Sequence, residues 1–259
     1  MNRITALASA LTMAAGSLAL AAPAQAAPAK AGAYTVTAKA NIDMAIAKED
    51  TVKVRGRVTP KAAGQKVVLQ QRVGKKKWTV TGSSKVKSNG TYVLKDKPST
   101  PGSREYRVLK PGSAGIAKGF SKSLPVEVYR WDKLVYRPAG PSTNLGVTGV
   151  NIGAEYFGQS LATGISGSAS SIEYTLGRKC LQLRATYALT DGSATGSSGA
   201  VQVSADGAVL AAHSLSVGTV VADEVLDISD VFRLKFDAST TATPAAIAAI
   251  ATPEVLCTR

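Results

Sequence analysis

The sequence predicts an all-β protein made of two β-sandwich domains, on the basis of three observations. Apolar and polar residues alternate over short segments, as in strands with one buried and one solvated face. Turn residues separate these segments, and the first half shows no helical period. Charge is uneven: residues 27–128 hold 21 Lys/Arg and 6 Asp/Glu (net +15), whereas residues 129–259 hold 9 and 11 (net −2). Two domains explain this asymmetry more simply than one.

Residues 1–26 predict a cleaved secretory signal peptide. Arg3 makes the start basic, residues 4–22 carry no charge, and Ala24-Gln25-Ala26 is a small-x-small cleavage site. The apolar stretch is rich in Ala, Gly and Ser, which favours cleavage over the alternative, a permanent anchor. Residues 27–33 are then a flexible leader, and no later apolar run is long enough for a transmembrane segment. We expect the mature protein to be secreted, extracellular and associated with the cell wall.

Residues 34–128 predict a strongly basic β-sandwich of about seven short strands. Hairpin turns are expected at the Gly-Lys-Lys-Lys run of residues 74–77 and at Asn89-Gly90, which is a strong hairpin signal. Residues 98–103 predict a loop. The strands are expected at residues 34–39, 52–57, 67–73, 78–80, 91–94, 105–109 and 121–129.

A resemblance to a known kind of domain supports this sandwich. The residues that carry it are Gly64, Val67-Val68-Leu69-Gln70, Trp78, Gly90-Thr91-Tyr92 and Tyr106-Arg107-Val108. In that order they resemble the immunoglobulin-like modules of secreted bacterial surface proteins, over about 60 residues. The resemblance implies an immunoglobulin-like fold for residues 34–128 and says nothing about a ligand.

The second domain is expected to begin near residues 128–132. Residues 138–153 are rich in Gly, Pro, Ser, Thr and Asn and predict loops. Strands are expected at residues 172–176, 180–189, 200–204 and 254–257, and along the alternating segment 225–236. Residues 190–199 predict a loop, 205–207 a turn, and the Ala-rich segment 244–251 one or two helical turns.

The second half resembles the NPCBM/NEW2 family of carbohydrate-binding modules over residues 130–259. The order of segments is the same as in that family, and its most specific piece is the run Leu176-Gly177-Arg178-Lys179-Cys180. The other matching segments are Trp131-Asp132-Lys133-Leu134, residues 156–160, 172–175, 201–207 and 225–236. The resemblance implies a galactose-binding-like jelly roll that holds sugar. The sequence departs from the family at residues 250–253, which read Ile-Ala-Thr-Pro where members often carry Trp-x-Asp-Pro.

The only two cysteines, Cys180 and Cys257, lie in the second half. A cysteine pair in an exported protein most simply forms one disulfide, and two free buried thiols are the alternative. The bond would tie the last strand to the middle of the domain.

Catalytic motifs are missing from the sequence. His213 is the only His, which excludes a two-His metal site, and we expect it at a surface position of a strand. No Gly-x-Ser-x-Gly elbow and no Gly-x-x-x-x-Gly-Lys-[Ser/Thr] phosphate loop occurs. We therefore expect no enzyme activity, no cofactor and no catalytic metal.

Four acids, Asp223, Glu224, Asp227 and Asp230, are close together in the sequence. Two carboxylates facing each other across a sugar would suit a glycosidase, and several carboxylate oxygens would suit a structural Ca²⁺ site. These residues belong to a loop that leads into a strand, and Asp227 has apolar neighbours. We interpret them as solvated acids, with calcium and catalysis as alternatives.

The excess of basic residues in the first half predicts attraction of polyanions. Lys75, Lys76 and Lys77 at a hairpin tip are the candidate contacts. Export argues against nucleic acid, and few aromatic residues are interleaved with the lysines to stack on bases. Teichoic-type wall polymers, acidic polysaccharides and anionic lipid headgroups are the expected partners outside a cell, and solubility alone is the alternative role of the charge.

Sugar binding needs exposed aromatic rings beside amides or acids. The candidates are Tyr156, Phe157 and Gln159 in one loop region and Tyr187 near Asp191; burial of the rings is the alternative. The sequence thus predicts a secreted, non-catalytic protein that binds carbohydrate or cell wall. The alternative is an extracellular structural or protein-interaction protein tethered electrostatically to anionic wall polymers.

Overall fold

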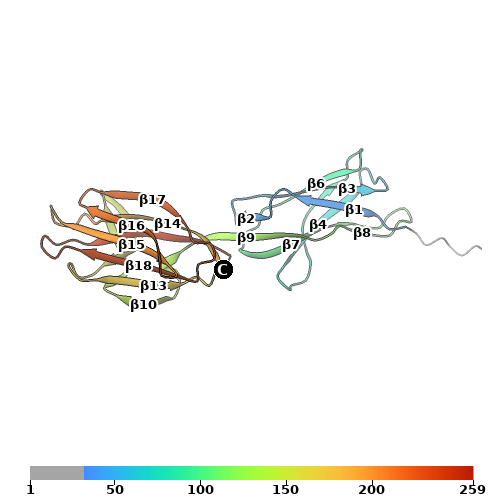
Figure 1. Ribbon diagram of the computed structural model, residues 1–259. Coiled ribbons are helices and arrows are strands. Elements are labelled where there is room, and N and C mark those ends of the chain that lie inside the picture. Colours follow the sequence, from blue (N-terminus) through green and yellow to red (C-terminus); the bar gives the residue numbers. More distant parts are fainter. Residues whose placement is uncertain (1–31, 259) are drawn as a thin grey trace, which may run out of the picture.

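The computed structural model describes residues 32–258, and within them the chain is all-β, as predicted. It forms nineteen strands and one short 3-10 turn, η1 (Leu134–Tyr136). The strands form two halves that lie end to end, with β9 passing from one to the other (Figure 1). The predicted signal peptide, most of the predicted leader and the last residue lie outside the described residues.

The N-terminal half, residues 33–128, is a sandwich of two sheets. One sheet has the order β1-β3-β6, and β5-β4-β7-β9 faces it, with β2 parallel to β9 and β8 beside β7. The strands are β1 (Thr35–Ala40), β2 (Met44–Ile46), β3 (Val52–Thr59), β4 (Lys66–Val73), β5 (Thr79–Lys85), β6 (Thr91–Asp96), β7 (Gly102–Lys110), β8 (Gly119–Phe120) and β9 (Leu124–Lys133).

Alternating side chains from both sheets form the core of this half. Val52 and Val54 of β3 pack toward Leu69 of β4 and Val108 of β7 in one buried cluster. Tyr106 is fully buried and its hydroxyl donates to Asp96 Oδ2 at 2.6 Å. Burial of the ring, and then the hydrogen bond to Asp96, raises the pKa of Tyr106. The period-two pattern of the sequence is therefore the pattern of burial.

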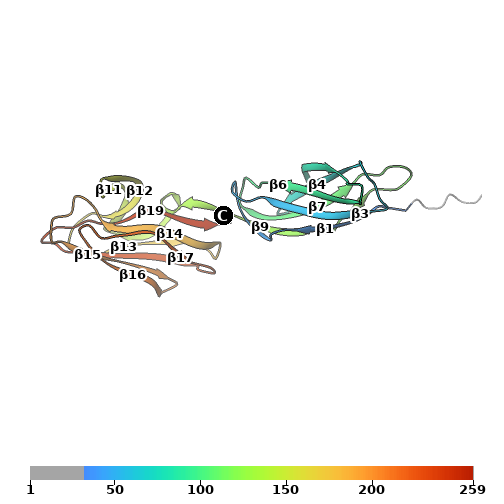
Figure 2. The same cartoon turned by 90° about the horizontal axis from the view of Figure 1, so that it is seen from above.

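The C-terminal half, residues 134–257, is a second sandwich. Its sheets have the orders β10-β13-β18-β15-β16 and β11-β12-β19-β14-β17. The strands are β10 (Ala139–Thr143), β11 (Leu145–Ile152), β12 (Glu155–Thr163), β13 (Ser170–Thr175), β14 (Cys180–Leu189), β15 (Ser198–Ala205), β16 (Ala208–Ser216), β17 (Val220–Asp227), β18 (Arg233–Thr240) and β19 (Ala248–Cys257). Figure 2 shows β11, β12, β19 and β14 side by side.

One strand, β9, belongs to both halves. Its first part pairs with β7, where Val128 lies opposite Gly102. Its last part pairs with β19, where Arg130 lies opposite Cys257 and Lys133 opposite Glu254. The expected domain boundary therefore falls within a single strand, and a continuous eleven-stranded sheet runs through the molecule.

The predicted disulfide is confirmed. Cys180 on β14 and Cys257 on β19 lie opposite each other and are bonded. Both cysteines are buried in the core cluster of the C-terminal half. Because Cys257 also pairs with β9, the bond fixes the place where the two halves meet.

Several local predictions are wrong in the C-terminal half. The expected loops at residues 138–153 form β10 and β11, because backbone pairing to β13 and β12 makes strands of residues that bury few side chains. The loop region at Tyr156–Gln159 belongs to β12. The segment 225–236 is not one strand: β17 ends at Asp227, and a turn with Asp230 in the left-handed region (φ 59°) precedes β18.

The Ala-rich segment 244–251 contains no helix. From Ala248 onward it is strand β19, with Ala248 and Ile250 in the main core and Ala249 and Ala251 in a second apolar cluster on the opposite face. Packing on both faces of the strand overrides the helix propensity of Ala. Across residues 32–258, no helix has the length and apolar character to cross a bilayer.

Replacing both cysteines, as Cys180→Ser with Cys257→Ser, is expected to lower the free energy of unfolding by about 4 kcal/mol, because a bond spanning 77 residues restricts the unfolded chain. Urea unfolding measures the change in free energy, and hydrogen exchange resolved by peptide shows where in the chain the stability is lost. Exchange should increase first in β14 and β19 and remain slow in the core of β3, β4 and β7. Reduced wild-type protein is the control, and equal stability of the double variant and the oxidised wild type would contradict the expectation.

Candidate functional site

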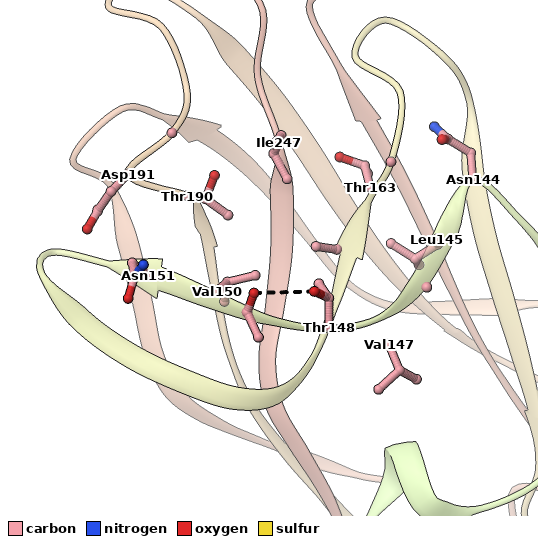
Figure 3. A pocket seen from close by; sticks show the side chains of 15 residues that line it. Asn144, Leu145, Val147, Thr148, Val150, Asn151, Thr163, Thr190, Asp191 and Ile247 are labelled. Atoms are coloured by element: carbon pink, nitrogen blue, oxygen red, sulfur yellow. Dashed lines mark hydrogen bonds between the residues drawn. The ribbon is translucent and has the colours of Figure 1, made fainter.

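An open groove of about 750 Å³ runs along β11. Figure 3 shows Asn151 and Asp191 together at one end and Asn144 at the other, with Val150 and Ile247 between them. Four of the lining residues are glycines, and five are apolar. The six polar ones are Asn144, Thr148, Asn151, Thr163, Thr190 and Asp191.

The apolar part of the groove rests on a small cluster on the outer face of the sheet. Val150, Ile152, Ala162, Ala188 and others are buried there, apart from the main core. Small Ala side chains leave room that Leu or Phe would fill. The hairpin of β11 and β12 packs on this alanine floor, and Val150, Ala162 and Ile247 reach the groove surface.

Asn144 holds the loop at one end of the groove. Its side-chain Oδ1 accepts from the Ile165 N–H at 2.6 Å, and its Nδ2 donates to the Ile165 carbonyl at 2.9 Å and to Ser170 Oγ at 2.8 Å. Asn144 itself has φ 48°, a left-handed conformation that Asn tolerates better than most residues. The side-chain amide of Asn144 is therefore fully engaged in hydrogen bonds that hold this end of the groove.

Asp191 holds the other end. Its two carboxylate oxygens accept from the N–H groups of Gly153 (2.7 Å) and Ala154 (2.8 Å) at the tip of the β11–β12 hairpin. Its own N–H donates to the Asn151 carbonyl at 2.9 Å. Both ends of the groove are thus fixed by side chains bonded to backbone, so the groove is preformed.

Several hydrogen-bonding groups remain for a ligand. β11 is an edge strand that pairs only with β12 among the described strands, and its residues 146–149 are exposed. The side chain of Asn151 is exposed and has no bond to another described residue, and the buried Thr190 hydroxyl has no partner within residues 32–258. The edge backbone and the Asn151 amide can each bond a polar ligand, whereas the Thr190 hydroxyl oxygen has almost no exposed surface.

Of the five predicted sugar contacts, Asp191 lines the groove, and Tyr156 lies against one of its lining residues, Gly149. Tyr156 is 69% exposed, and its ring lies against Gly149, where an added Cβ would be 2.2 Å from the Tyr156 hydroxyl oxygen. The absence of a side chain at Gly149 therefore lets the ring rest beside the groove.

The other three lie elsewhere. Phe157 is half-buried and packs against the alanine cluster. Gln159 accepts a hydrogen bond from the ammonium group of Lys133, which ties β12 to β9. Tyr187 is fully buried in the main core, so its prediction as a ligand contact is wrong. The pairing of β14 with β19 sets which of its side chains face inward, and the sequence does not show that register.

His213 links two strands at the open side of the C-terminal sandwich. Its Nε2 is 2.9 Å from Glu224 Oε2, and its ring stacks on Tyr187 with 4.8 Å between the ring centroids. Burial, and then the charge of Glu224, raises the pKa of Tyr187. His213 is in a strand as predicted, and its side chain bridges β16 and β17 with only 14% exposed.

Contrary to expectation, the four acids do not belong to one loop, and they do not converge: Asp223, Glu224 and Asp227 are in β17, and Asp230 is in the turn that follows it. Glu224 bonds His213, whereas Asp227 accepts from the Ser229 N–H at 2.8 Å. The hydroxyl and N–H of Ser229 lower the pKa of Asp227, so this carboxyl is ionised at neutral pH and cannot act as a general acid. Within residues 32–258 no three His, Cys, Asp or Glu side chains gather in a way that could hold a metal.

Lys75, Lys76 and Lys77 are exposed in the turn between β4 and β5, far along the chain from the groove. None of them forms an ion pair with another described residue. They stay candidate polyanion contacts.

Most residues of the groove were not predicted. Asn144, Thr148 and Asn151 lie in the segment interpreted as loops, whose Gly, Thr and Asn content was the available signal. Thr190 follows a strand that was predicted, but its nearness to β11 depends on pairing across the sheet. The groove combines segments about 40 and 100 residues apart in the sequence.

No protein-family model matches the chain, and no curated protein is similar to it. Among solved structures it is similar to "CBM51-2 in complex with GlcNAc and INT domains from Clostridium perfringens ZmpB", with 10% identity, a TM-score of 0.40, and coverage of 86% of this chain and 48% of that one. It is also similar to the secreted serine protease VesC from Vibrio cholerae, with 10% identity, a TM-score of 0.30, and coverage of 85% and 50%. The chain spans about half the length of each, and at these scores neither a function nor a ligand carries over.

Removing the Asp191 carboxylate is expected to release the hairpin tip. Asp191→Ala loses the acceptor of two N–H groups, at a cost of about 1–2 kcal/mol for charged but exposed hydrogen bonds. Amide exchange of Gly153 and Ala154 should accelerate, while the β18 amides stay protected. Asp191→Asn keeps one acceptor oxygen, so its exchange rates at these amides should lie between those of wild type and Asp191→Ala. Unchanged exchange in both variants would show that Asp191 does not hold the hairpin tip.

Asp227→Asn is expected to change how stability depends on pH. The folded-state pKa of Asp227 is below the ordinary value of 3.8, so its contribution is present above that pH and is lost as the pH falls through the folded pKa. Melting temperatures from pH 7 to pH 2 should therefore differ between wild type and variant at neutral pH and converge in acid. Asp223→Asn is the charge-matched control, since its carboxylate accepts no hydrogen bond from the described residues. A difference in melting temperature between wild type and Asp227→Asn that persists to pH 2 would contradict the lowered pKa of Asp227.

Proposed function

We propose that this protein is a secreted, non-catalytic carbohydrate-binding protein and that the groove along β11 is its sugar site. The observation that carries the proposal is a preformed groove with a small apolar floor, four glycines and a polar rim. Its volume of about 750 Å³ suits a ligand of one or a few sugar rings.

The lining matches the surface of a sugar. Sugar rings present hydroxyls around the edge and C–H groups on the faces. Asn151, Thr148 and the exposed backbone of β11 offer bonds to hydroxyls, while Val150 and Ile247 offer apolar contact. Tyr156 beside Gly149 supplies an exposed ring on which a sugar face can stack.

A binding role without chemistry fits the carboxylates of the groove. A glycosidase needs two carboxyls about 5 Å or 6.5–9.5 Å apart. Among the described residues that line the groove, Asp191 is the only carboxylate, and it is bonded to two backbone N–H groups. Its role in the proposal is to shape the site.

Secretion is supported by the first 26 residues and by the disulfide. Disulfides persist in oxidising compartments outside the cytosol. The net charge of +15 in residues 27–128 supports association with an anionic cell wall. In this proposal the basic half retains the protein near the wall, and the groove recognises a glycan.

A second candidate function uses the same edge strand. Exposed backbone on β11 from Gly146 to Gly149 could pair with an extended peptide. The protein would then be an extracellular structural or interaction protein. Binding of a protein partner that survives competition by soluble glycans would favour this alternative.

Blocking the groove is expected to abolish glycan retention. A Cβ at Gly146 meets no atom within 4 Å and its backbone has no left-handed strain, so Gly146→Leu fills open space without disturbing the fold. Pull-down of the full chain on insoluble and soluble neutral glycans at 0.5 M salt, roughly three times physiological ionic strength, measures retention by contacts rather than by charge. The variant should bind at least about tenfold more weakly.

Ala208→Leu is the matched control, because it adds the same side chain at an exposed strand position outside the groove. It should bind like wild type. No retention of wild type on any glycan, or equal retention of wild type and Gly146→Leu, would refute the proposed site.

A further inference from the structure

A row of alternating cations and aromatic rings crosses the outer face of the N-terminal sheet. The Arg107 guanidinium carbon lies 4.1 Å from the centre of the Trp78 ring and 4.4 Å from that of Phe120. The Arg72 guanidinium carbon also lies 4.8 Å from the centre of the Trp78 ring, and Lys118 Nζ lies 5.9 Å from the centre of the Phe120 ring. These distances are within the range of cation–π attraction. We name these five residues, from β4, β7, β8 and the segments before β5 and β8, the cation–aromatic row.

The two arginines of the row are held in place. Arg72 donates to Glu105 Oε2 at 2.5 Å, and Arg107 Nε donates to Gln70 Oε1 at 2.9 Å. A guanidinium that is stacked on a ring and bonded at one edge loses little further freedom when its other N–H groups bind an anion. The row is therefore preorganised.

Arg107 carries charge that the protein leaves uncompensated. Its terminal N–H groups have no acceptor within residues 32–258, and no described carboxylate forms an ion pair with it. Burial, and then repulsion from Arg72 across the Trp78 ring, lowers its pKa. An anion beside Arg107 would relieve both costs.

The surroundings select the class of anion. The turn of Lys75, Lys76 and Lys77 leads directly into Trp78, so positive charge extends beyond the row. Trp78 is half-buried and already contacts the guanidiniums of Arg72 and Arg107, which compete with nucleic-acid bases for stacking on its ring. Repeated cations along a flat sheet suit an extended polymer that carries oxyanions at intervals.

We propose that the cation–aromatic row binds the oxyanion groups of an acidic polysaccharide. This site is separate from the β11 groove and does not depend on the sugar-binding role proposed for it. Arg107 supplies the planar fork for one sulfate, phosphate or carboxylate group, Arg72 and Lys118 flank it, and the lysine turn adds screened, less specific attraction.

Dextran sulfate, with neutral dextran as the uncharged counterpart, tests the proposal on the full-length protein by titration calorimetry over a salt series. Arg107→Gln should weaken binding of dextran sulfate by about tenfold or more, the effect of one lost charge-assisted bond. Arg107→Lys keeps the charge but loses the planar fork, and it should also bind more weakly than wild type.

Arg55→Gln is the matched control: the same change at an exposed position on β3, in the opposite sheet. It should weaken binding of dextran sulfate by less than about threefold, because removing this charge reduces only the long-range attraction of the whole domain. Trp78→Leu, which removes the ring and keeps every charge, provides an independent variant should Arg107→Gln fail to fold, and it too should weaken binding.

Equal losses in Arg107→Gln and Arg55→Gln, or unchanged binding by Trp78→Leu, would overturn the row as a site. Tighter binding of an oligothymidylate or of phosphatidylglycerol vesicles than of dextran sulfate would overturn the polysaccharide assignment. Gly146→Leu should bind dextran sulfate like wild type, so failure of this proposal and failure of the groove proposal are distinguishable.

Discussion

The structure depends on one shared strand. β9 is hydrogen-bonded to β7 in one sandwich and to β19 in the other, so one sheet of each half is part of a single continuous sheet. A flexible linker would let the halves rotate independently, whereas a paired strand fixes their angle through ladder hydrogen bonds. The Cys180–Cys257 bond closes the same point, because Cys257 lies opposite Arg130 of β9.

The groove inherits its rigidity from this junction. β19, anchored by β9 and by the disulfide, pairs with β12, and β12 carries the edge strand β11. The two clamping side chains, Asn144 and Asp191, then fix the ends. In the proposed role, a ligand that enters such a site would remove little protein entropy, and this would favour its binding.

Strands could be predicted from the sequence where one face of the strand is buried, and they were missed where neither face is buried. The alternation in residues 52–57 marks β3 because Val52 and Val54 enter the core, and the cysteine pair had one simple solution. β10 is exposed throughout, so its sequence carries no burial pattern and looks like loop. Tyr156 and Tyr187 were both candidate sugar contacts, yet one is exposed and the other is core, because strand register is set by partners far along the chain. Trp78, Arg107 and Phe120 likewise meet only through pairing of β4, β7 and β8.

The two proposed surfaces differ in the distance over which they act. The basic half attracts anions over about a Debye length, on the order of 8–10 Å at cellular salt, and this attraction falls as salt rises. The nearly neutral groove acts only in contact, through hydrogen bonds and apolar packing that salt weakens little. Because β9 places both on one sheet, the two proposals together imply that capture of an acidic polymer by the first would raise the local concentration of neighbouring glycan at the second. A rigid connection would make this gain depend on geometry, because only glycans at a spacing that matches the molecule would benefit; under these proposals the shared strand itself contributes to specificity.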